Sequence, residues 1–354
     1  MKFISYTYPW LENILKKELE QRKIDIFEIW PWFVKFLWDE SILVKTNLWL
    51  RTANKVYLIL DEQKVKTFDE LFQIVTSINW KKYIPKWFSI SIKPHVIKSK
   101  LHHLPSIQKI THKAIIKKLV WNKKYLSWEK QIEIRIDIFK DNLLILLDTS
   151  WEPLYKRWYR KNIAKAWLKE TLAAWIILLS KCKSEICFDP FCWSWTLLIE
   201  KALIDLNIAP WSFRNFLFEE FSWIDKNLIE KEKWRAKTRI KEKKLSSFAS
   251  DIDKNMVEIA KENIKSAWLE KYIKVEQKDF LKTEIKECII TNPPYNKRIK
   301  IQNIEEIYQK LYKDMKNCKC AGLITWYEDI DKTFYDFKVR VLSNGWDKVK
   351  FFYK

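Results

Sequence analysis

The sequence predicts an α/β protein in two parts, an α+β amino-terminal half and a carboxy-terminal half with a doubly wound parallel sheet. The first observation is the order strand–helix–strand–strand–helix–strand over residues 1–61, which is typical of a ferredoxin-like unit. The second is the alternation of helices and short apolar strands after residue 166, which indicates a parallel sheet covered by helices. The third is a polar, basic segment at residues 151–165 that separates the two patterns.

The spacing of apolar residues predicts the helices and strands of the amino-terminal half. In the first helix, Ile14, Leu15 and Leu19 share one face and charged residues lie opposite, as expected for a helix packed on a sheet. The expected strands are 3–7, 25–28, 33–37, 56–60, 88–93, 131–138 and 143–148, and the expected helices are 11–21, 47–54, 67–78 and 106–119.

The carboxy-terminal half alternates more regularly. We expect helices at 167–180, 196–206, 254–267 and 304–316 and strands at 185–188, 247–251, 273–276, 287–291 and 322–325. Residues 208–246 interrupt this pattern and include a basic, exposed helix within 231–244. The predicted domains are therefore 1–62, 63–150, a basic linker at 151–165, and 166–354.

Charge and cysteine usage limit the partners. The net charge of +21 favours a polyanion as partner, although a solvated lysine-rich surface is the alternative. Residues 93–118 carry seven lysines, all four histidines and no acid, which favours a phosphate-contacting surface. No two of the six cysteines have CxxC spacing, so we expect a reduced, cytoplasmic protein with no metal site. The longest apolar run, 172–179, is too short to span a bilayer, so we expect no membrane partner, and we expect a monomer.

Glycine and tryptophan are used abnormally. The chain has 2 glycines and 21 tryptophans, whereas average usage predicts roughly 25 glycines in this length. Many tryptophans occupy turns that normally need glycine, at positions 10, 30, 32, 121, 151, 193, 195, 211 and 268. Our hypothesis is that UGA codons that mean glycine in the source organism were translated as tryptophan, with Trp49, Trp80 and Trp346 the best candidates for true tryptophans. The alternative is a protein that is tryptophan-rich in fact.

The ends of the predicted parallel strands carry a consistent set of motifs. Residues 189–196 read DPFCWSWT, which becomes the glycine-rich loop DPFCGSGT if 193 and 195 are glycines. After the next strands, Asp251 can accept from two ribose hydroxyls and Asp279 from an adenine amino group. This set describes a nucleoside cofactor without a pyrophosphate, which indicates S-adenosylmethionine (SAM) rather than NAD.

The fourth strand ends in Asn292-Pro293-Pro294-Tyr295. The Asn292 side-chain oxygen and the Pro293 carbonyl can both accept from one planar amino group, which would direct its nitrogen lone pair toward a methyl donor. Tyr295 offers a ring on which a target base can stack. The alternative is a structural Asn-Pro turn.

Together DPFCxSxT, SDID, KDF and NPPY, with LKETLAA and KRxYR before them, resemble the bacterial THUMP-domain RNA guanine-N2 methyltransferases, of the 23S ribosomal RNA RlmL/YpsC type. Residues 47–56 and 98–115 are similar to that family as well. The resemblance implies a Rossmann-like class I SAM methyltransferase domain preceded by an α+β ferredoxin-like plus THUMP module. It implies that ribosomal RNA (23S), or a large-subunit precursor, is the partner.

The candidate site residues follow from the motifs and the resemblance. The catalytic candidates are Asn292, Pro293, Pro294 and Tyr295; the cofactor-binding candidates are Asp189, Phe191, Cys192, Trp193, Ser194, Trp195, Thr196, Asp251, Ile252, Asp279, Phe280 and Asn292; the RNA-binding candidates are Lys98, Lys100, Lys109, Lys113, Arg157, Arg160, Lys231, Lys233, Arg235 and Lys237.

Three other functions stay open from the sequence. THUMP modules also serve enzymes that methylate guanine N2 in tRNA, and an NPPY motif can also hold adenine N6 in DNA or RNA. If Trp193 and Trp195 are real, the cofactor loop is blocked and a non-enzymatic RNA-binding protein is the remaining interpretation.

Overall fold

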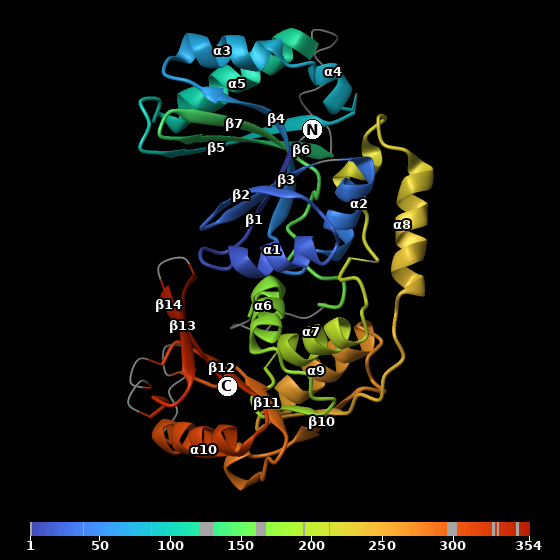
Figure 1. Cartoon of the computed structure of the whole chain (residues 1–354), viewed down its shortest axis with the longest axis vertical. Helices are drawn as coiled ribbons and strands as arrows, with labels where there is room; N and C mark the ends of the chain where they lie inside the picture. Colours follow the sequence, from blue (N-terminus) through green and yellow to red (C-terminus); the bar gives the residue numbers. More distant parts are fainter. Residues whose placement is uncertain are drawn as a thin grey trace.

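The described residues form two sheets of seven strands each, one in each half of the chain (Figure 1). The structure is a computed structural model that describes residues 2–37, 39–85, 87–119, 130–160, 168–193, 195–211, 213–295, 303–327, 330, 333–344 and 347–354. In these ranges, none of the helices is long and apolar enough to cross a membrane. The tryptophans at 121 and 346 and the candidate Ser194 lie outside the described residues.

The amino-terminal sheet has the strand order β2-β3-β1-β4-β7-β6-β5. Its ferredoxin-like part consists of β1 (Lys2–Tyr6), α1 (Glu12–Glu20), β2 (Ile26–Trp30), β3 (Phe33–Leu37), α2 (Glu40–Trp49) and β4 (Lys55–Lys64). The next part consists of α3 (Phe68–Ser77), α4 (Trp80–Tyr83), β5 (Ser89–Ile97), α5 (Leu104–Leu119), β6 (Gln131–Phe139) and β7 (Asn142–Asp148). Because β4 pairs antiparallel with β7, the first two predicted domains share one continuous sheet.

One predicted helix of this half is wrong. The sequence predicts a helix over 47–54, but α2 begins after Asp39, whose side chain accepts from the Ile42 amide at 2.8 Å. The helix ends at Trp49, because the amides of Arg51 and Thr52 donate to the carboxylate of Glu18, at 2.9 and 3.0 Å. A buried acid on α1 therefore takes the backbone donors that would have continued the helix.

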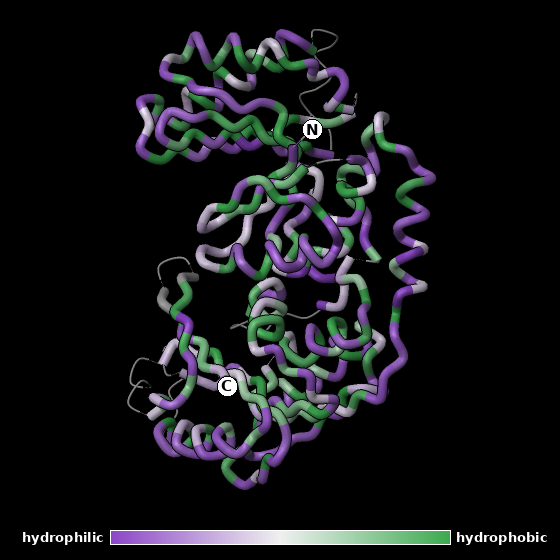
Figure 2. The backbone as a smooth tube through the Cα atoms, viewed as in Figure 1, coloured by the Kyte–Doolittle hydropathy of each residue, from purple (hydrophilic) through white to green (hydrophobic). Residues whose placement is uncertain are grey.

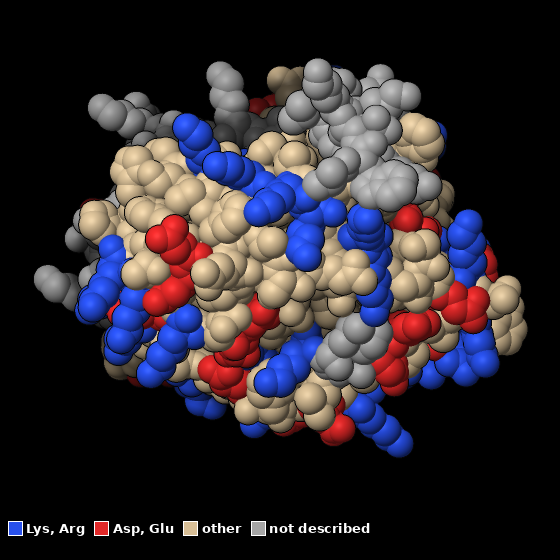
Figure 3. Space-filling model, turned by 90° about the horizontal axis from the view of Figure 1, so that it is seen from above, with Lys and Arg blue, Asp and Glu red and all other residues tan. Residues whose placement is uncertain are grey.

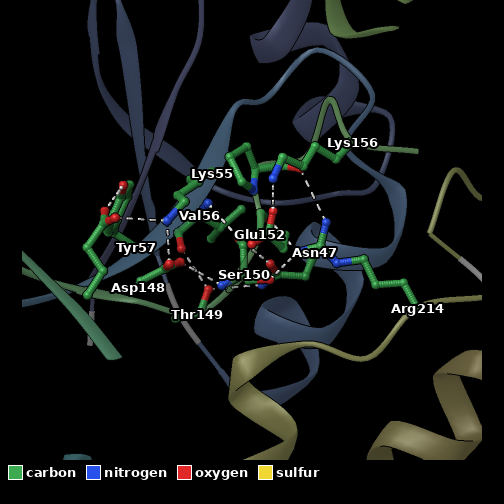
Figure 4. A network of polar contacts seen from close by, with 12 residues as sticks. Asn47, Lys55, Val56, Tyr57, Asp148, Thr149, Ser150, Glu152, Lys156 and Arg214 are labelled. Atoms are coloured by element: carbon green, nitrogen blue, oxygen red, sulfur yellow. Dashed lines mark hydrogen bonds and ion pairs between the residues drawn. The ribbon is translucent and has the colours of Figure 1, made fainter. Parts of the chain in front are cut away.

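A polar network fixes the junction between the two amino-terminal parts and the following linker (Figure 4). Lys55 on β4 pairs with Asp148 on β7 at 2.6 Å. The side-chain nitrogen of Asn47 donates to the Thr149 hydroxyl at 3.1 Å, and its side-chain oxygen accepts from the Ser150 hydroxyl at 2.7 Å. These contacts fix the positions of α2, β4 and the end of β7 relative to one another.

The carboxy-terminal sheet has the order β10-β9-β8-β11-β12-β14-β13, and its first five strands are parallel. Its elements are α6 (Glu170–Ser180), β8 (Cys187–Asp189), α7 (Thr196–Asp205), α8 (Lys226–Thr238), β9 (Ser247–Asp251), α9 (Lys254–Ser266), β10 (Ile273–Gln277), β11 (Cys288–Thr291), α10 (Ile304–Asn317), β12 (Ala321–Thr325), β13 (Lys338–Asn344) and β14 (Asp347–Tyr353), with short 3₁₀ turns at Leu217–Glu220 and Phe280–Lys282. The last two strands form an antiparallel hairpin that the sequence analysis did not predict. The doubly wound class is otherwise confirmed.

The basic helix of the inserted segment begins earlier than expected. Asp225 caps α8 by accepting from the Asn227 amide at 2.9 Å, and the helix ends at Thr238 rather than near residue 244. It packs against α2 and lies along one side of the molecule, where it is hydrophilic over most of its length (Figure 2).

Buried ion pairs fix the linker to the carboxy-terminal half, which corrects two RNA-binding candidates. The Arg157 side chain is fully buried and its Nε lies 3.0 Å from Glu200 on α7. Arg160 is nearly buried, with its Nε 2.6 Å from Glu170 on α6. The prediction that Arg157 and Arg160 contact RNA is therefore wrong, because both guanidinium groups are used inside the protein. The sequence shows that Arg157 and Arg160 are charged, but it does not show that Glu200 and Glu170 pair with them in the interior.

Among the tryptophans that the structure describes, five have a left-handed backbone, which is the conformation that glycine adopts at low cost. Their φ angles are 69° at Trp10, 71° at Trp151, 40° at Trp193, 67° at Trp195 and 57° at Trp268. A side chain in this region costs about 1–2 kcal/mol for each residue. All five are positions that the sequence analysis singled out as glycine-type turns.

The tryptophans expected to be genuine behave differently. Trp80 is buried and its indole donates to the Val75 carbonyl at 2.7 Å, and Trp49 is buried at the end of α2. Among the other glycine-type candidates, Trp30 lies within β2, and the buried Trp211 donates to the Leu50 carbonyl at 3.3 Å. Backbone conformation therefore separates the candidates for recoding into two groups.

Candidate active site

The strand-end motifs meet at the carboxyl edge of the parallel sheet, as expected for this class of fold. β8 and β11 are neighbouring parallel strands, and Asp189 ends the first as Asn292 follows the second. The Thr291 hydroxyl donates to Asp189 at 2.6 Å and so links the two strand ends. Thr291 was missed by the sequence analysis, although its position directly before the NPPY motif was a usable signal.

The loop after β8 bends over the edge of the sheet. The Cys192 amide donates to the Ser250 carbonyl at 3.1 Å, and the Trp193 amide donates to the Asp251 carboxylate at 3.2 Å. The Trp195 amide donates back to the Cys192 carbonyl at 2.6 Å, and Trp195 itself is the residue before α7. The loop therefore has the form of a tight turn that opens a helix.

Burial raises the pKa of two acids in this site, Asp189 and Asp251. The pKa of Asp189 rises to about 8, because the carboxyl group is fully buried, against the opposing effect of the hydrogen bonds from Thr291 and the Phe191 amide. Burial also raises the pKa of Asp251. Buried carboxyl groups of this kind suit a ligand that brings its own positive charge.

The other candidates are placed as follows. The Asp279 carboxylate accepts from the Leu281 amide at 3.0 Å, and the rings of Phe191 and Phe280 are 4.9 Å apart. Thr196 is buried as the first residue of α7, while Ile252 is 69% exposed. The structure thus brings most of the predicted set to one edge, with Ile252 at its outer limit.

The space between these residues is nearly filled. The cavity has a volume of about 20 Å³ and is lined by Asp189, Phe191, Cys192, Trp193, Trp195, Thr196 and Asn292, with Leu168 and Leu197, which the sequence analysis missed. This is about the room that one water molecule needs, whereas sites for small molecules and cofactors occupy about 300–1,000 Å³. The Trp193 indole donates to the Asn292 carbonyl at 2.9 Å, so it lies across the NPPY motif.

Two buried polar atoms of the residues that line this cavity, the Asn292 side-chain oxygen and the Trp195 indole nitrogen, have no hydrogen-bond partner among the described residues. The side-chain oxygen of Asn292 is buried and accepts no hydrogen bond within the described part of the chain. A buried acceptor left in this state costs about 1–3 kcal/mol. An unmet acceptor at the cavity indicates a position where a donor group of a ligand belongs.

A much larger hollow, of about 870 Å³, lies on the amino-terminal sheet. Several of the charged side chains that line it pair with one another: Lys35 lies 2.7 Å from Glu28, and Arg135 lies 2.7 Å from Asp137. It is far from the strand-end motifs along the chain. We therefore take the small cavity at the strand ends as the candidate active site.

An acid after the first strand of the domain, a turn leading into a helix, further acids after the next strands and NPPY after the fourth together define a SAM-dependent methyltransferase. Three family models match the chain: an RMKL-like methyltransferase domain at residues 157–350, an RlmL ferredoxin-like domain at 2–57 and a THUMP domain at 65–148. The chain belongs to the family of RMKL-like methyltransferases that carry an RlmL-type ferredoxin-like domain and a THUMP domain.

Individual relatives agree with this assignment. The "Putative RNA methyltransferase YpsC" of Bacillus subtilis is 35% identical over 90% of this chain and 87% of its own length. A "Ribosomal RNA large subunit methyltransferase K/L" of Psychromonas ingrahamii is 31% identical over 84% of this chain, which spans only 42% of that protein. A solved structure described as "SMU.472, a putative methyltransferase complexed with SAH" is 32% identical, with a TM-score of 0.87 over 99% of this chain and 97% of that one.

The cofactor of this family does not fit the chain with tryptophan at 193 and 195. The carboxylates suit it, but Trp195 is only 1% exposed and the indole of Trp193 spans the cavity. Glycine at both positions would remove the two indoles and relieve the left-handed backbone at the same time.

The buried state of Asp189 makes stability depend on pH. The pKa of Asp189 is higher in the folded than in the unfolded chain. Its contribution to the free energy of unfolding is therefore present at acid pH and is lost as the pH rises toward 8. We expect Asp189→Asn to raise the melting temperature relative to the parent at pH 8.5 more than at pH 5, measured by calorimetry. An equal change at both pH values would contradict this account of Asp189.

Proposed function

We propose that the chain, with glycine at 193 and 195, transfers a methyl group from SAM to the exocyclic N2 of a guanine in large-subunit (23S) ribosomal RNA. Bound SAM supplies an electrophilic methyl group. The observation that carries the proposal is the buried side-chain oxygen of Asn292, just after β11, which accepts no hydrogen bond from any residue that the structure describes. Such an oxygen can accept a hydrogen from a planar amino group and fix the direction of its nitrogen lone pair.

RNA as the substrate is supported by the names of the relatives and by the THUMP domain. The direct test is to incubate the glycine form with SAM and RNA from ribosomal subunits and to identify the methylated nucleoside by mass spectrometry. N2-methylguanosine from 23S RNA would support the proposal. Methyl groups found only in tRNA, or on adenine N6, would replace it with one of the alternative functions.

The basic surface for RNA is proposed at the THUMP end of the molecule. Lys98, Lys100, Lys109 and Lys113 are all exposed on the β5–α5 segment. Figure 3 looks onto this end and shows Lys and Arg side chains gathered there, with Asp and Glu between them. On α8, by contrast, only Lys231 and Lys237 of the four candidates are exposed, because Lys233 pairs with Glu219 at 2.8 Å and Arg235 with Glu232.

Neutralising the four β5–α5 lysines is expected to weaken binding to RNA of any sequence, because phosphate contacts do not depend on the bases. The slope of log affinity against log salt should become shallower by about 0.7–0.9 for each lysine that contacts a phosphate. Filter binding over a series of salt concentrations measures both effects. The variant carries glutamine at 98, 100, 109 and 113, and a control variant carries glutamine at the exposed Lys254, Lys261, Lys265 and Lys271. The same change in slope for both variants would show that this surface has no special role.

A further inference from the structure

Three cysteines that are far apart in sequence converge at the amino edge of the carboxy-terminal sheet. They are Cys182 in the loop after α6, Cys288 at the start of β11 and Cys320 directly before β12. Their sulfur atoms all lie within 4.8 Å of one another, and those of Cys182 and Cys288 are 2.8 Å apart. The Cys320 sulfur contacts both of the others, with Cα separations of 5.7 Å to Cys182 and 5.0 Å to Cys288.

The sheet itself sets this arrangement. β11 and β12 pair in parallel with Ile289 opposite Ala321, so the residues just before them, Cys288 and Cys320, stand side by side. The Ile289 amide donates to the Cys320 carbonyl at 3.2 Å and fixes their relative height. The site lies at the opposite ends of the strands from the candidate active site, so the two are separate.

Three sulfurs around one point suit a shared ligand better than a single covalent pair. A disulfide joins two sulfurs and would leave the third thiol buried against it. Thiolates are the preferred ligands of soft metal ions such as Zn²⁺ and Cu⁺. Cys182 and Cys288 are buried and Cys320 is half-buried, so the group is closed on one side and reachable on the other.

The surroundings favour bound thiolates. Lys181, Lys183 and Lys319 directly flank two of the cysteines and are exposed, and positive charge near a thiol stabilises its thiolate. Cys320 is half-buried, so solvent reaches this side of the group, and a zinc ion held by three protein ligands takes water as its fourth.

We propose that Cys182, Cys288 and Cys320 form a three-thiolate site for a thiophilic metal ion of the Zn²⁺ class. On binding, three metal–sulfur bonds form and the thiol protons pass to solvent. The ion ties the loop after α6 to β11 and β12, and so stabilises the sheet from the edge opposite the candidate active site. Sequence spacing gave no sign of this site, because each ligand comes from a different element.

The test is a Cd²⁺ titration of the full-length, reduced protein, followed by the thiolate-to-metal charge-transfer absorption in the near ultraviolet. We expect saturation at one ion per chain, and a melting temperature that rises with added Zn²⁺. Cys320→Ser should bind the ion at least about 10-fold more weakly, since loss of even an outer-shell partner costs that much.

Cys318→Ser is the matched control, because Cys318 is also buried and lies two residues away. It should titrate like the parent, and circular dichroism shows that both variants are folded. The proposal is overturned if the reduced parent gives no saturable absorption, or if both variants lose it equally. It is also overturned if the protein purified without reductant carries a disulfide between two of the three cysteines and fails to bind Cd²⁺ after reduction.

Discussion

Replacing Trp193 and Trp195 by glycine is expected to raise the affinity for S-adenosylhomocysteine by about 100-fold or more, equivalent to about 2.7 kcal/mol. The cavity with both indoles present holds about 20 Å³, and the Trp193 indole is hydrogen-bonded to the Asn292 carbonyl across it. Removing the indoles opens the space between Asp189 and Asn292 and frees amides of the loop for a ligand. Isothermal titration of both forms measures the difference.

Trp80→Gly is the matched control, since it removes an equally large buried indole outside this site. It should lower the free energy of unfolding by about 3–5 kcal/mol, as loss of a large core side chain does, without a gain in ligand affinity. If the tryptophan form binds S-adenosylhomocysteine as tightly as the glycine form, the account of the blocked cavity is wrong.

Asn292→Ala in the glycine form is expected to reduce methyl transfer by about 10²–10³-fold, the usual effect of losing one positioned polar group at a reacting centre. The affinity for S-adenosylhomocysteine should change little, because the role proposed for the Asn292 side chain is to face the target amino group. Single-turnover transfer of labelled methyl to RNA measures the rate, and titration measures the affinity.

Asn255→Ala, at an exposed asparagine on α9, controls for the substitution itself and should leave both quantities unchanged. If Asn292→Ala loses cofactor affinity in proportion to its rate, Asn292 is a cofactor-binding residue and the proposed role is mistaken. If it keeps its full rate, the NPPY motif is a structural turn.

Much of the fold could be predicted, because apolar periodicity and strand ends are local signals. The strands at 33–37 and 247–251 are confirmed at both ends. The same signals placed the strand-end acids and Asn292 at one edge, since the carboxyl ends of parallel strands lie together.

What the sequence could not show depends on contacts between distant residues. The bounds of α2 depend on Glu18, and the burial of Arg157 depends on Glu200. The convergence of Cys182, Cys288 and Cys320 depends on the pairing of β11 with β12. None of these partners is marked by spacing along the chain.

The tryptophans at 193 and 195 are unusual in both the sequence and the structure. At 193 and 195 the sequence predicts turns that need glycine. The structure shows left-handed φ angles at both positions and a cavity that is nearly filled. Glycine at both positions would relieve the left-handed backbone and open the cavity.

The most direct test of this account is a mass spectrum of the peptide that covers residues 187–201, taken from the protein as made in its native organism. We predict the mass of glycine at both 193 and 195, which would leave the loop open to SAM. Tryptophan mass at both positions would contradict the account, and the chain would then be a methyltransferase fold with a blocked site that is left to bind RNA.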